Sequence, residues 1–237
     1  MKCLLLATGF LTRIPVPAIT VPPADFAATI RYYPIVGLLI GFTVAVVGWM
    51  GAQVDPWLGA LAALTMWVGI TGALHLDGLG DLADGLGAAH GDRTRLIAVM
   101  ADPHIGSFGV VAIVLQLLAK LVLLHALSPM AWWPLILLPF AARIGPLVWA
   151  RWLPPLKPGL GASVAGAVRY RDLIGWGAVW TGACALLPAL IVTPLLIGGW
   201  ALYLRHRMGG INGDAHGAGI ELVETALLLI LMIASRL

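Results

Sequence analysis

Charged residues are scarce in this chain of 237 residues: they make up 11% of it, whereas hydrophobic residues make up 60%. A soluble globular domain carries about 25% charged residues, so this composition excludes an ordinary soluble domain. The mean hydropathy is +0.96, and several apolar stretches approach the length of about 20 residues that a helix needs to cross a bilayer. The sequence therefore predicts an all-α, polytopic membrane protein, a bundle of helices embedded in lipid.

Cysteine is also nearly absent. Cys3 and Cys184 lie far apart in apolar stretches, which excludes a disulfide framework and a cysteine-based metal site. The formal net charge is only +3, and most basic residues have a topological explanation, so we expect no nucleic-acid partner. The sequence also shows no low-complexity tract and no soluble domain. Residues 1–237 are therefore predicted to form one membrane-embedded catalytic domain.

The apolar stretches predict about seven membrane-spanning helices. They cover residues 34–52, 57–74, 105–127, 130–150, 173–204 and 220–235. The stretch 173–204 is too long for one span, and Pro188 near its centre allows a hairpin of two compact spans; a single crossing would lower the total to six. The N-terminal apolar run ends early at Arg13 and lacks a convincing signal-peptide cleavage site. It is predicted to be a half-helix lying in the membrane interface.

Basic residues set the expected orientation, because Lys and Arg accumulate in cytoplasmic loops. With the hairpin, every Lys and Arg falls on the cytoplasmic side except Lys120, Arg143 and Arg236. Lys120 and Arg143 lie within predicted spans. Because a charge facing lipid is costly, we expect both to face the bundle interior or a polar cavity.

The stretch "HLDGLGDLADGL", residues 75–86, concentrates negative charge. Asp77, Asp81 and Asp84 follow i, i+4, i+7 spacing and would share one face of a helix. No Lys or Arg lies between them, so the carboxylates would raise one another's pKa unless a cation sat among them. A hard divalent ion, Mg²⁺ or Mn²⁺, is the simplest compensation; the alternative is a solvated helix end at the membrane surface. Asp84 is also a candidate catalytic residue.

Phosphate-binding candidates follow this cluster. Gly106 and Ser107 begin the predicted span 105–127, and free backbone N–H groups at a helix start suit a phosphate, although small residues also serve helix packing in membranes. Arg93 and Arg95 could hold phosphate, but the positive-inside rule explains them equally well. Asp102, His75 and His104, which flank the acidic stretch or the glycines, are weaker candidates. Each histidine is as readily an interfacial hydrogen-bonding residue.

A second acidic motif, "NGDAHGAGIELVE", covers residues 212–224. Asp214 is the single carboxylate in its glycine-rich part, and Glu221 follows seven residues later. Both acidic motifs would lie at cytoplasmic helix ends, so we expect Asp214 to join the first cluster in one site. Its role there would be that of a general base or a further metal ligand. Glycine and aspartate also form ordinary turns.

Five stretches of the sequence resemble successive blocks of the cobalamin synthase family, the adenosylcobinamide-GDP ribazoletransferases. They are, in order, "FLTRIPVP", "YYPIVGLLIG", "HLDGLGDLADGL", "IGSFGVVAIVL" and "NGDAHGAGIELVE". The resemblance covers nearly the whole chain. It implies a phosphotransferase that joins alpha-ribazole, or its 5′-phosphate, to the cobinamide phosphate of adenosylcobinamide-GDP, releasing GMP and forming adenosylcobalamin or its 5′-phosphate. It also implies Mg²⁺ as cofactor and a bacterial or archaeal cytoplasmic membrane, with the active site facing the cytoplasm.

One position departs from the family pattern. The family usually has Lys or Arg before the aspartate that precedes "IGSFG", where this chain has Ala101. If that Lys or Arg binds a phosphate in the family, we expect Arg93, Arg95 or His104 to bind the phosphate in this chain.

An ion-coupled transporter is the alternative function. Intramembrane acids mark ion pathways, and Glu221 and Glu224 would fit. Transporters, however, place their acids near the midplane at broken helices, whereas most acids here collect in predicted cytoplasmic loops. The sequence leaves open a homo-oligomer or a complex with other enzymes of the cobalamin pathway.

Overall fold

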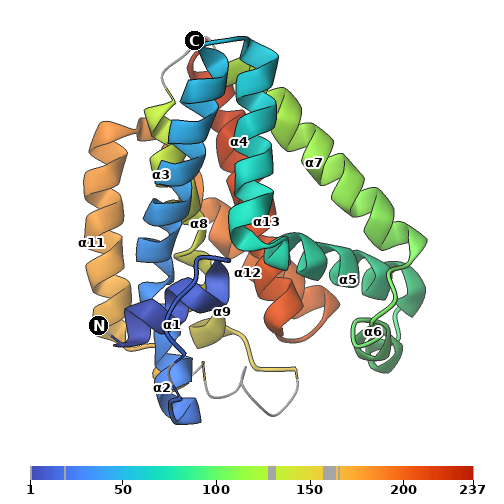
Figure 1. Cartoon of the computed structure of the whole chain (residues 1–237). Helices are drawn as coiled ribbons and strands as arrows, with labels where there is room; N and C mark the ends of the chain where they lie inside the picture. The colour runs from blue at the N-terminus through green and yellow to red at the C-terminus, as the bar shows by residue number, and fades with distance from the viewer. Residues whose placement is uncertain (1, 19, 128–131, 157–163, 165, 237) are drawn as a thin grey trace.

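The computed structural model describes residues 2–18, 20–127, 132–156, 164 and 166–236, and in these residues it is helical, with one isolated β-bridge and no strand. The all-α prediction is confirmed. The elements are α1 (Lys2–Leu11), α2 (Pro23–Ala27), η1 (Ala28–Tyr32), α3 (Tyr33–Ala52), α4 (Pro56–Thr71), α5 (Leu74–Ala89), α6 (Arg93–Val99), α7 (Ser107–Leu127), η2 (Trp133–Ile136), α8 (Leu137–Ala142), α9 (Gly145–Trp152), α11 (Tyr170–Leu186), η3 (Pro188–Val192), α12 (Thr193–Arg207) and α13 (Gly213–Ala234). The long helices run up and down the molecule, while α5 lies across its lower end (Figure 1).

Five stretches of the described chain are long and apolar enough to cross a membrane. They are Pro23–Ala52, Ser107–Leu127, Trp133–Trp152, Pro188–Arg207 and Gly213–Ala234. Helices α4 and α5 add a sixth only if this bent pair is taken as one span. Helix α11 has 17 residues, about 26 Å at 1.5 Å per residue, slightly less than a hydrocarbon core of about 30 Å.

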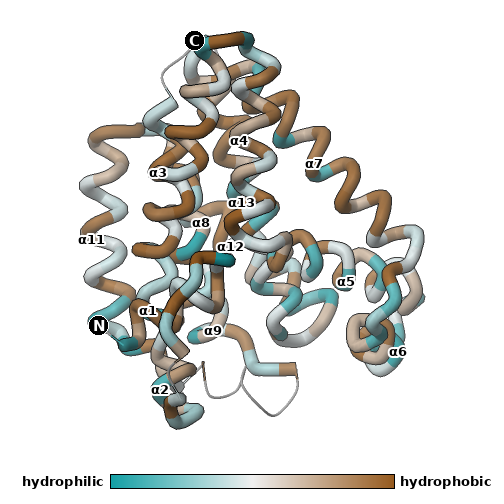
Figure 2. The backbone as a smooth tube through the Cα atoms, in the orientation of Figure 1, coloured by the Kyte–Doolittle hydropathy of each residue, from teal (hydrophilic) through white to brown (hydrophobic). Residues whose placement is uncertain are grey.

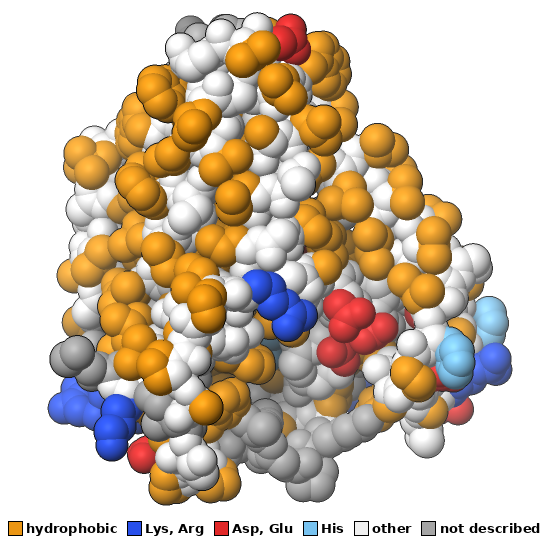
Figure 3. Space-filling view, viewed as in Figure 1, with side chains coloured by type: hydrophobic (Ala, Val, Ile, Leu, Met, Phe, Trp, Pro, Cys, Tyr) orange, Lys and Arg blue, Asp and Glu red, His pale blue; other side chains and the backbone are white. Residues whose placement is uncertain are grey.

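Polarity is divided between the two ends of the molecule. The tube of Figure 2 is mostly brown, and hydrophobic, along the long helices. In the space-filling view, hydrophobic side chains cover most of the upper part. Apart from one acidic side chain at the top, Lys, Arg, Asp, Glu and His are seen in the lower half (Figure 3). This distribution is expected of a protein whose upper helices lie in lipid.

The stretch 173–204 reverses direction, as the hairpin prediction requires. It is divided into α11 and the η3–α12 segment by Leu187, whose backbone is non-helical, just before Pro188. The loops on its two sides meet: the Ile211 amide donates to the Pro154 carbonyl at 2.9 Å, and the Leu156 amide donates to the Ile211 carbonyl at 3.0 Å. A single crossing would put these loops on opposite sides of the membrane, so the hydrogen bonds support the hairpin. With five or six candidate spans found, the total of seven stays a prediction.

The junction of α4 and α5 differs from the prediction. The span was expected to reach residue 74 and to be followed by a loop, but α4 ends at Thr71 and the chain turns by 84° into α5. Gly72 and Ala73 have left-handed backbones with φ of 60° and 59°. A side chain at Gly72 would collide with the Arg13 guanidinium. Residues 75–104 are therefore mainly two helices, α5 and α6, at the lower end of the molecule.

The N-terminal run forms the expected short helix, α1. It packs against η1 and α3 rather than standing alone, and the following residue Arg13 donates its backbone N–H to the Ile70 carbonyl at 2.7 Å. This hydrogen bond holds the chain that follows α1 against the end of α4, next to the α4–α5 bend.

Candidate active site

Helix α5 and the start of α13 lie in close contact, and this contact brings the two acidic motifs together. A Cβ at Gly78 would come within 2.7 Å of the Asp214 carbonyl oxygen and 2.8 Å of its Cα, so only glycine allows this approach. Asn212 caps α13 by accepting from the Ala215 amide at 3.0 Å, and its Nδ2 donates to the Asp214 carboxylate at 2.8 Å. Asp214 is thus fixed in the first turn of α13, beside α5.

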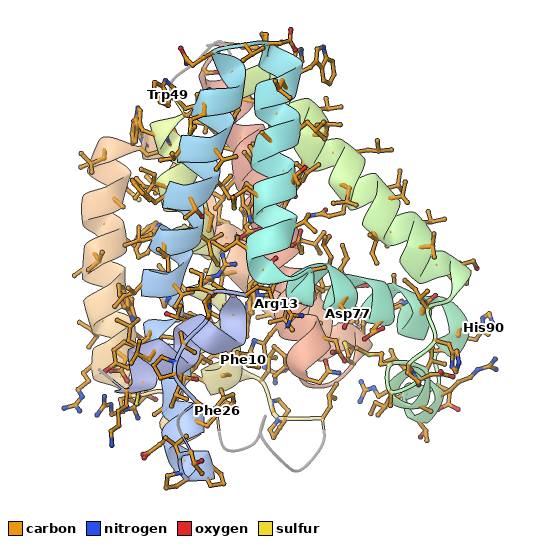
Figure 4. All side chains as sticks on the ribbon, in the orientation of Figure 1. Phe10, Arg13, Phe26, Trp49, Asp77 and His90 are labelled. Atoms are coloured by element: carbon orange, nitrogen blue, oxygen red, sulfur yellow. The ribbon has the colours of Figure 1, made fainter. Side chains whose placement is uncertain are left out.

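The aspartates form one patch of negative charge. Burial raises the pKa of Asp81 to about 6, together with the charges of Asp214, Asp77 and Asp84. In the described part of the chain, neither Asp77 nor Asp81 forms an ion pair. A red patch marks the acidic surface in Figure 3, and Asp77 is labelled there in Figure 4. Charge of this kind attracts a cation.

Arg13 is a site residue that sequence reasoning missed. It was treated as the end of the N-terminal run, but Figure 4 shows Arg13 and Asp77 on the same side of the molecule, near the start of α5. The α4–α5 bend puts it there, because the guanidinium lies directly over Gly72. Its presence in the block "FLTRIPVP" was the one signal that could have pointed to it.

The oxygen donors of this patch fit a hard divalent cation. Among the described residues, no three side chains of His, Cys, Asp or Glu converge closely enough to hold a metal ion unaided. Mg²⁺, however, is usually bound through one or two carboxylates plus the phosphates of a substrate, rather than by an all-protein cage. Asp77 and Asp81 could therefore hold Mg²⁺ or Mn²⁺ jointly with a phosphate-bearing ligand, with the Asp214 carboxylate beside them as a further ligand or as a base.

Asp84 is engaged elsewhere. Its side chain is buried, and its two oxygens accept hydrogen bonds from the backbone amides of Gly106 at 2.7 Å and Gly109 at 2.9 Å. It thus caps the start of α7, where a phosphate was predicted. The expectation of a free Gly106 amide is wrong, because Asp84 already occupies it; Ser107, the first residue of α7, is exposed.

The remaining phosphate candidates lie away from this patch. Arg93 and Arg95 are exposed on α6, and a Cβ at Gly209 would come within 2.6 Å of the Arg93 Nη1. Arg93 lines a separate cavity of about 220 Å³ at the end of α12. Asp102 and His104 pair with each other at 2.7 Å in an exposed loop rather than with the aspartate cluster. The hydrogen bonds from the His104 backbone and ring lower the pKa of Asp102.

A cavity of about 350 Å³ opens beside the acidic patch. Its walls come from α1, α2, η1, α3, α5, α9 and α13. Most of the wall is apolar, with Phe10, Phe26 and Tyr33 among its residues, and Asp77 and Asp214 also line it. The carboxylates predicted for chemistry therefore adjoin a space that can accept a small molecule.

Buried charges next to this cavity are paired. Lys120 contacts Glu221 and Glu224, each at 2.8 Å, and Arg143 contacts Glu224 at 2.7 Å. Lys120 and Arg143 are 2% and 0% exposed, which confirms that both face the interior. His75 adjoins the network, with Nδ1 3.4 Å from the Arg143 guanidinium. Glu221 and Glu224 are thus neutralised inside the bundle, which removes the feature that favoured a transporter.

Comparison with known proteins places the chain in one family. Residues 3–232 match the model of the family described as cobalamin-5-phosphate synthase. A protein of Novosphingobium aromaticivorans is 59% identical over 97% of this chain and 95% of its own length. Proteins of Laribacter hongkongensis (49% identical, covering 100% and 99%) and Thiobacillus denitrificans (46% identical, covering 97% and 94%) are also similar. All three are named adenosylcobinamide-GDP ribazoletransferase. No solved structure matches the chain.

Proposed function

The chain belongs to the cobalamin-5-phosphate synthase family, and we propose that it transfers the cobinamide phosphate of adenosylcobinamide-GDP to alpha-ribazole or its 5′-phosphate. The products are GMP and adenosylcobalamin, or the 5′-phosphate of the latter. The observation that carries this proposal is the meeting of Asp77 and Asp214 at a cavity large enough for a small molecule, with Asp81 close enough to feel the charges of both.

The reaction is a displacement at phosphorus. A ribose hydroxyl oxygen of the acceptor forms a bond to the phosphorus that carries cobinamide, and the diphosphate bond to that phosphorus breaks, releasing GMP. The hydroxyl proton needs an acceptor within hydrogen-bond reach. We assign this role to Asp214, because its carboxylate lines the cavity and is held by Asn212.

Asp77 and Asp81 would hold Mg²⁺ or Mn²⁺. When bound, such an ion neutralises the charge that develops on the phosphate oxygens. Without it, three carboxylates would repel a diphosphate, so the acidic patch by itself is a poor anion site. Arg13, at the edge of the patch, is the cation that we expect to contact the phosphates from the other side (Figure 4).

The location of the site also supports a cytoplasmic orientation. The aspartates and the loop at Ile211 lie at the lower end of Figure 1, and Lys and Arg gather at that end in Figure 3. By the positive-inside rule this end faces the cytoplasm, and we propose a bacterial or archaeal cytoplasmic membrane. Association with a second copy, or with other enzymes of the pathway, stays a prediction.

The test is an assay of the purified protein with adenosylcobinamide-GDP and alpha-ribazole. We expect GMP release only when both substrates and Mg²⁺ are present, and its loss when the ion is removed with a chelator. Arg13→Gln should raise the KM for adenosylcobinamide-GDP about tenfold or more, the scale of one charged hydrogen bond. Lys2→Gln is the control, since it removes a charge from the other end of the same N-terminal segment. Absence of turnover in the wild-type protein would contradict the proposed function.

A further inference from the structure

We propose that the cavity of about 350 Å³ binds the aromatic base of the acceptor nucleoside, and that Phe10, Phe26 and Tyr33 select that base. This inference rests on the proposed function and adds to it the place and the recognition of one substrate. It leaves the corrinoid outside the cavity, at the acidic patch.

Three aromatic rings form a prearranged wall of the cavity. The rings of Phe10 and Phe26 meet edge to face at a centroid distance of 5.4 Å, and those of Phe10 and Tyr33 lie nearly parallel at 6.3 Å. All three residues line the cavity. Phe10 remains 45% exposed, so the protein covers only part of its ring. A flat apolar ring would bury this surface and gain ring–ring contacts.

A buried donor without a partner indicates what else the ligand carries. His75 lines the cavity, is 3% exposed, and its Nε2 has no hydrogen-bond partner. Its Nδ1 faces the Arg143 guanidinium, which can only donate. Nδ1 is therefore the acceptor and Nε2 carries the hydrogen. A buried N–H without a partner is costly, so the complementary ligand offers an acceptor atom in otherwise apolar surroundings.

Of the two substrates, only the acceptor nucleoside fits these requirements. Ligand cavities range over about 300–1,000 Å³, and this one lies at the small end, too small for a corrin macrocycle with its side chains. The guanine of the second substrate bears polar groups around its edge that apolar walls would leave unpaired. Ribazole carries an alkylated benzimidazole, a flat apolar bicycle with one unsubstituted ring nitrogen as its acceptor.

The position of the carboxylates agrees with this occupant. Asp77 and Asp214 line the same cavity, so a base bound among the aromatic rings would leave its ribose near the acidic patch. The attacking hydroxyl would then be close to the residue that accepts its proton and to the metal-bound diphosphate. Binding the two substrates on either side of Asp214 would hold the reacting atoms together.

The experiment separates the two substrates. Phe10→Ala and Phe26→Ala should each raise the KM for alpha-ribazole about tenfold, the effect of about 1.4 kcal/mol, and leave the KM for adenosylcobinamide-GDP unchanged. Phe42→Ala is the matched control, because Phe42 is exposed on α3 and does not line this cavity. Titration of the detergent-purified protein with alpha-ribazole alone, without corrinoid or Mg²⁺, should show the same weakening of Kd in both cavity variants.

Two outcomes would overturn the assignment. One is an unchanged Kd for alpha-ribazole in both variants, and the other is a rise in the KM for adenosylcobinamide-GDP instead. In either case the wild-type protein would still release GMP from its two substrates, so the proposed function would stand. A wild-type protein that binds alpha-ribazole through Phe10 but releases no GMP would refute the proposed function and leave the cavity assignment intact.

Discussion

Replacing Asp84 by asparagine distinguishes a structural role from a catalytic one. The structure gives its carboxylate two backbone donors, Gly106 at 2.7 Å and Gly109 at 2.9 Å, in a buried position. Asparagine keeps one acceptor oxygen, but its NH₂ group would face the second backbone N–H. The variant thus loses a charge-assisted hydrogen bond, which costs about 1.5–3 kcal/mol of stability. It also leaves one buried N–H donor without an acceptor, which costs about 1–3 kcal/mol.

The expected loss is therefore at least about 2.5 kcal/mol of unfolding free energy. For a chain of this size, each kcal/mol lowers the Tm by about 2–4 °C, so Asp84→Asn should unfold at least about 5 °C below the wild type in detergent. Gly109→Ala should resemble it, because the new methyl group would collide with the Asp84 carboxylate and lie 2.9 Å from the Gly80 carbonyl. Tm followed by tryptophan fluorescence is a suitable measurement.

Asp77→Asn is the matched control. Asp77 is exposed, so this variant should keep the wild-type Tm while losing turnover by about a hundredfold, the scale of a lost catalytic group. Asp84→Asn, assayed well below its Tm, should retain much more activity than Asp77→Asn. The reasoning would be refuted if Asp84→Asn kept the wild-type Tm and lost turnover as completely as Asp77→Asn, since Asp84 would then act in the reaction and not as a helix anchor.

Three further predictions follow from the site and the buried network. Asp77→Asn and Asp214→Asn should each lower kcat strongly, and the double variant should lose far less than the product of the two effects, because residues of one site act as a unit; a simply multiplicative loss would place them in separate sites. In the metal-free folded state the pKa of Asp81 is raised to about 6, so the folded state is more stable when this carboxyl is protonated. That stability is present at low pH and is lost as the pH rises through about 6. The Tm of the metal-free wild type should therefore fall relative to that of Asp81→Asn between about pH 4 and pH 7, and added Mg²⁺ should reverse this trend. Tm curves that run parallel for the two proteins would contradict this role of Asp81. Lys120→Met should cost about 3–5 kcal/mol, because it leaves buried carboxylates uncompensated. Adding Glu221→Gln should restore part of that loss, since Arg143 and Glu224 would remain paired, and a double-mutant cycle in urea measures whether it does.

The sequence predicted the structure correctly where the pattern of neighbouring residues alone determines it. Hydropathy gave the helical membrane fold, and the i, i+4, i+7 spacing correctly put Asp77, Asp81 and Asp84 on a helix. The count of basic residues favoured the hairpin between 173 and 204, which the hydrogen bonds of Ile211 support. Each of these inferences depends on neighbouring residues or on overall polarity.

Other features depend on contacts between distant segments, which periodicity does not reveal. That Asp84 turns toward α7 follows from the position of Gly106 and Gly109, and no spacing rule distinguishes it from Asp81. The role of Arg13 depends on a left-handed bend at Gly72 and Ala73, a backbone conformation in which alanine is unusual. The aromatic cavity needs three N-terminal elements to lie beside the first turn of α13, and only the folded chain shows this.

The buried ion network has a consequence for how the chain is assembled in the membrane. Lys120 and Arg143 are made and inserted well before their partners Glu221 and Glu224, which belong to the last helix, α13. Until α13 enters, each cation costs about 2.5–3.5 kcal/mol in a lipid-inserted helix. Arrival of the C-terminal helix neutralises both and, in the same step, places Asp214 beside α5. A chain that stops short of α13 would therefore keep two uncompensated buried charges and would lack Asp214.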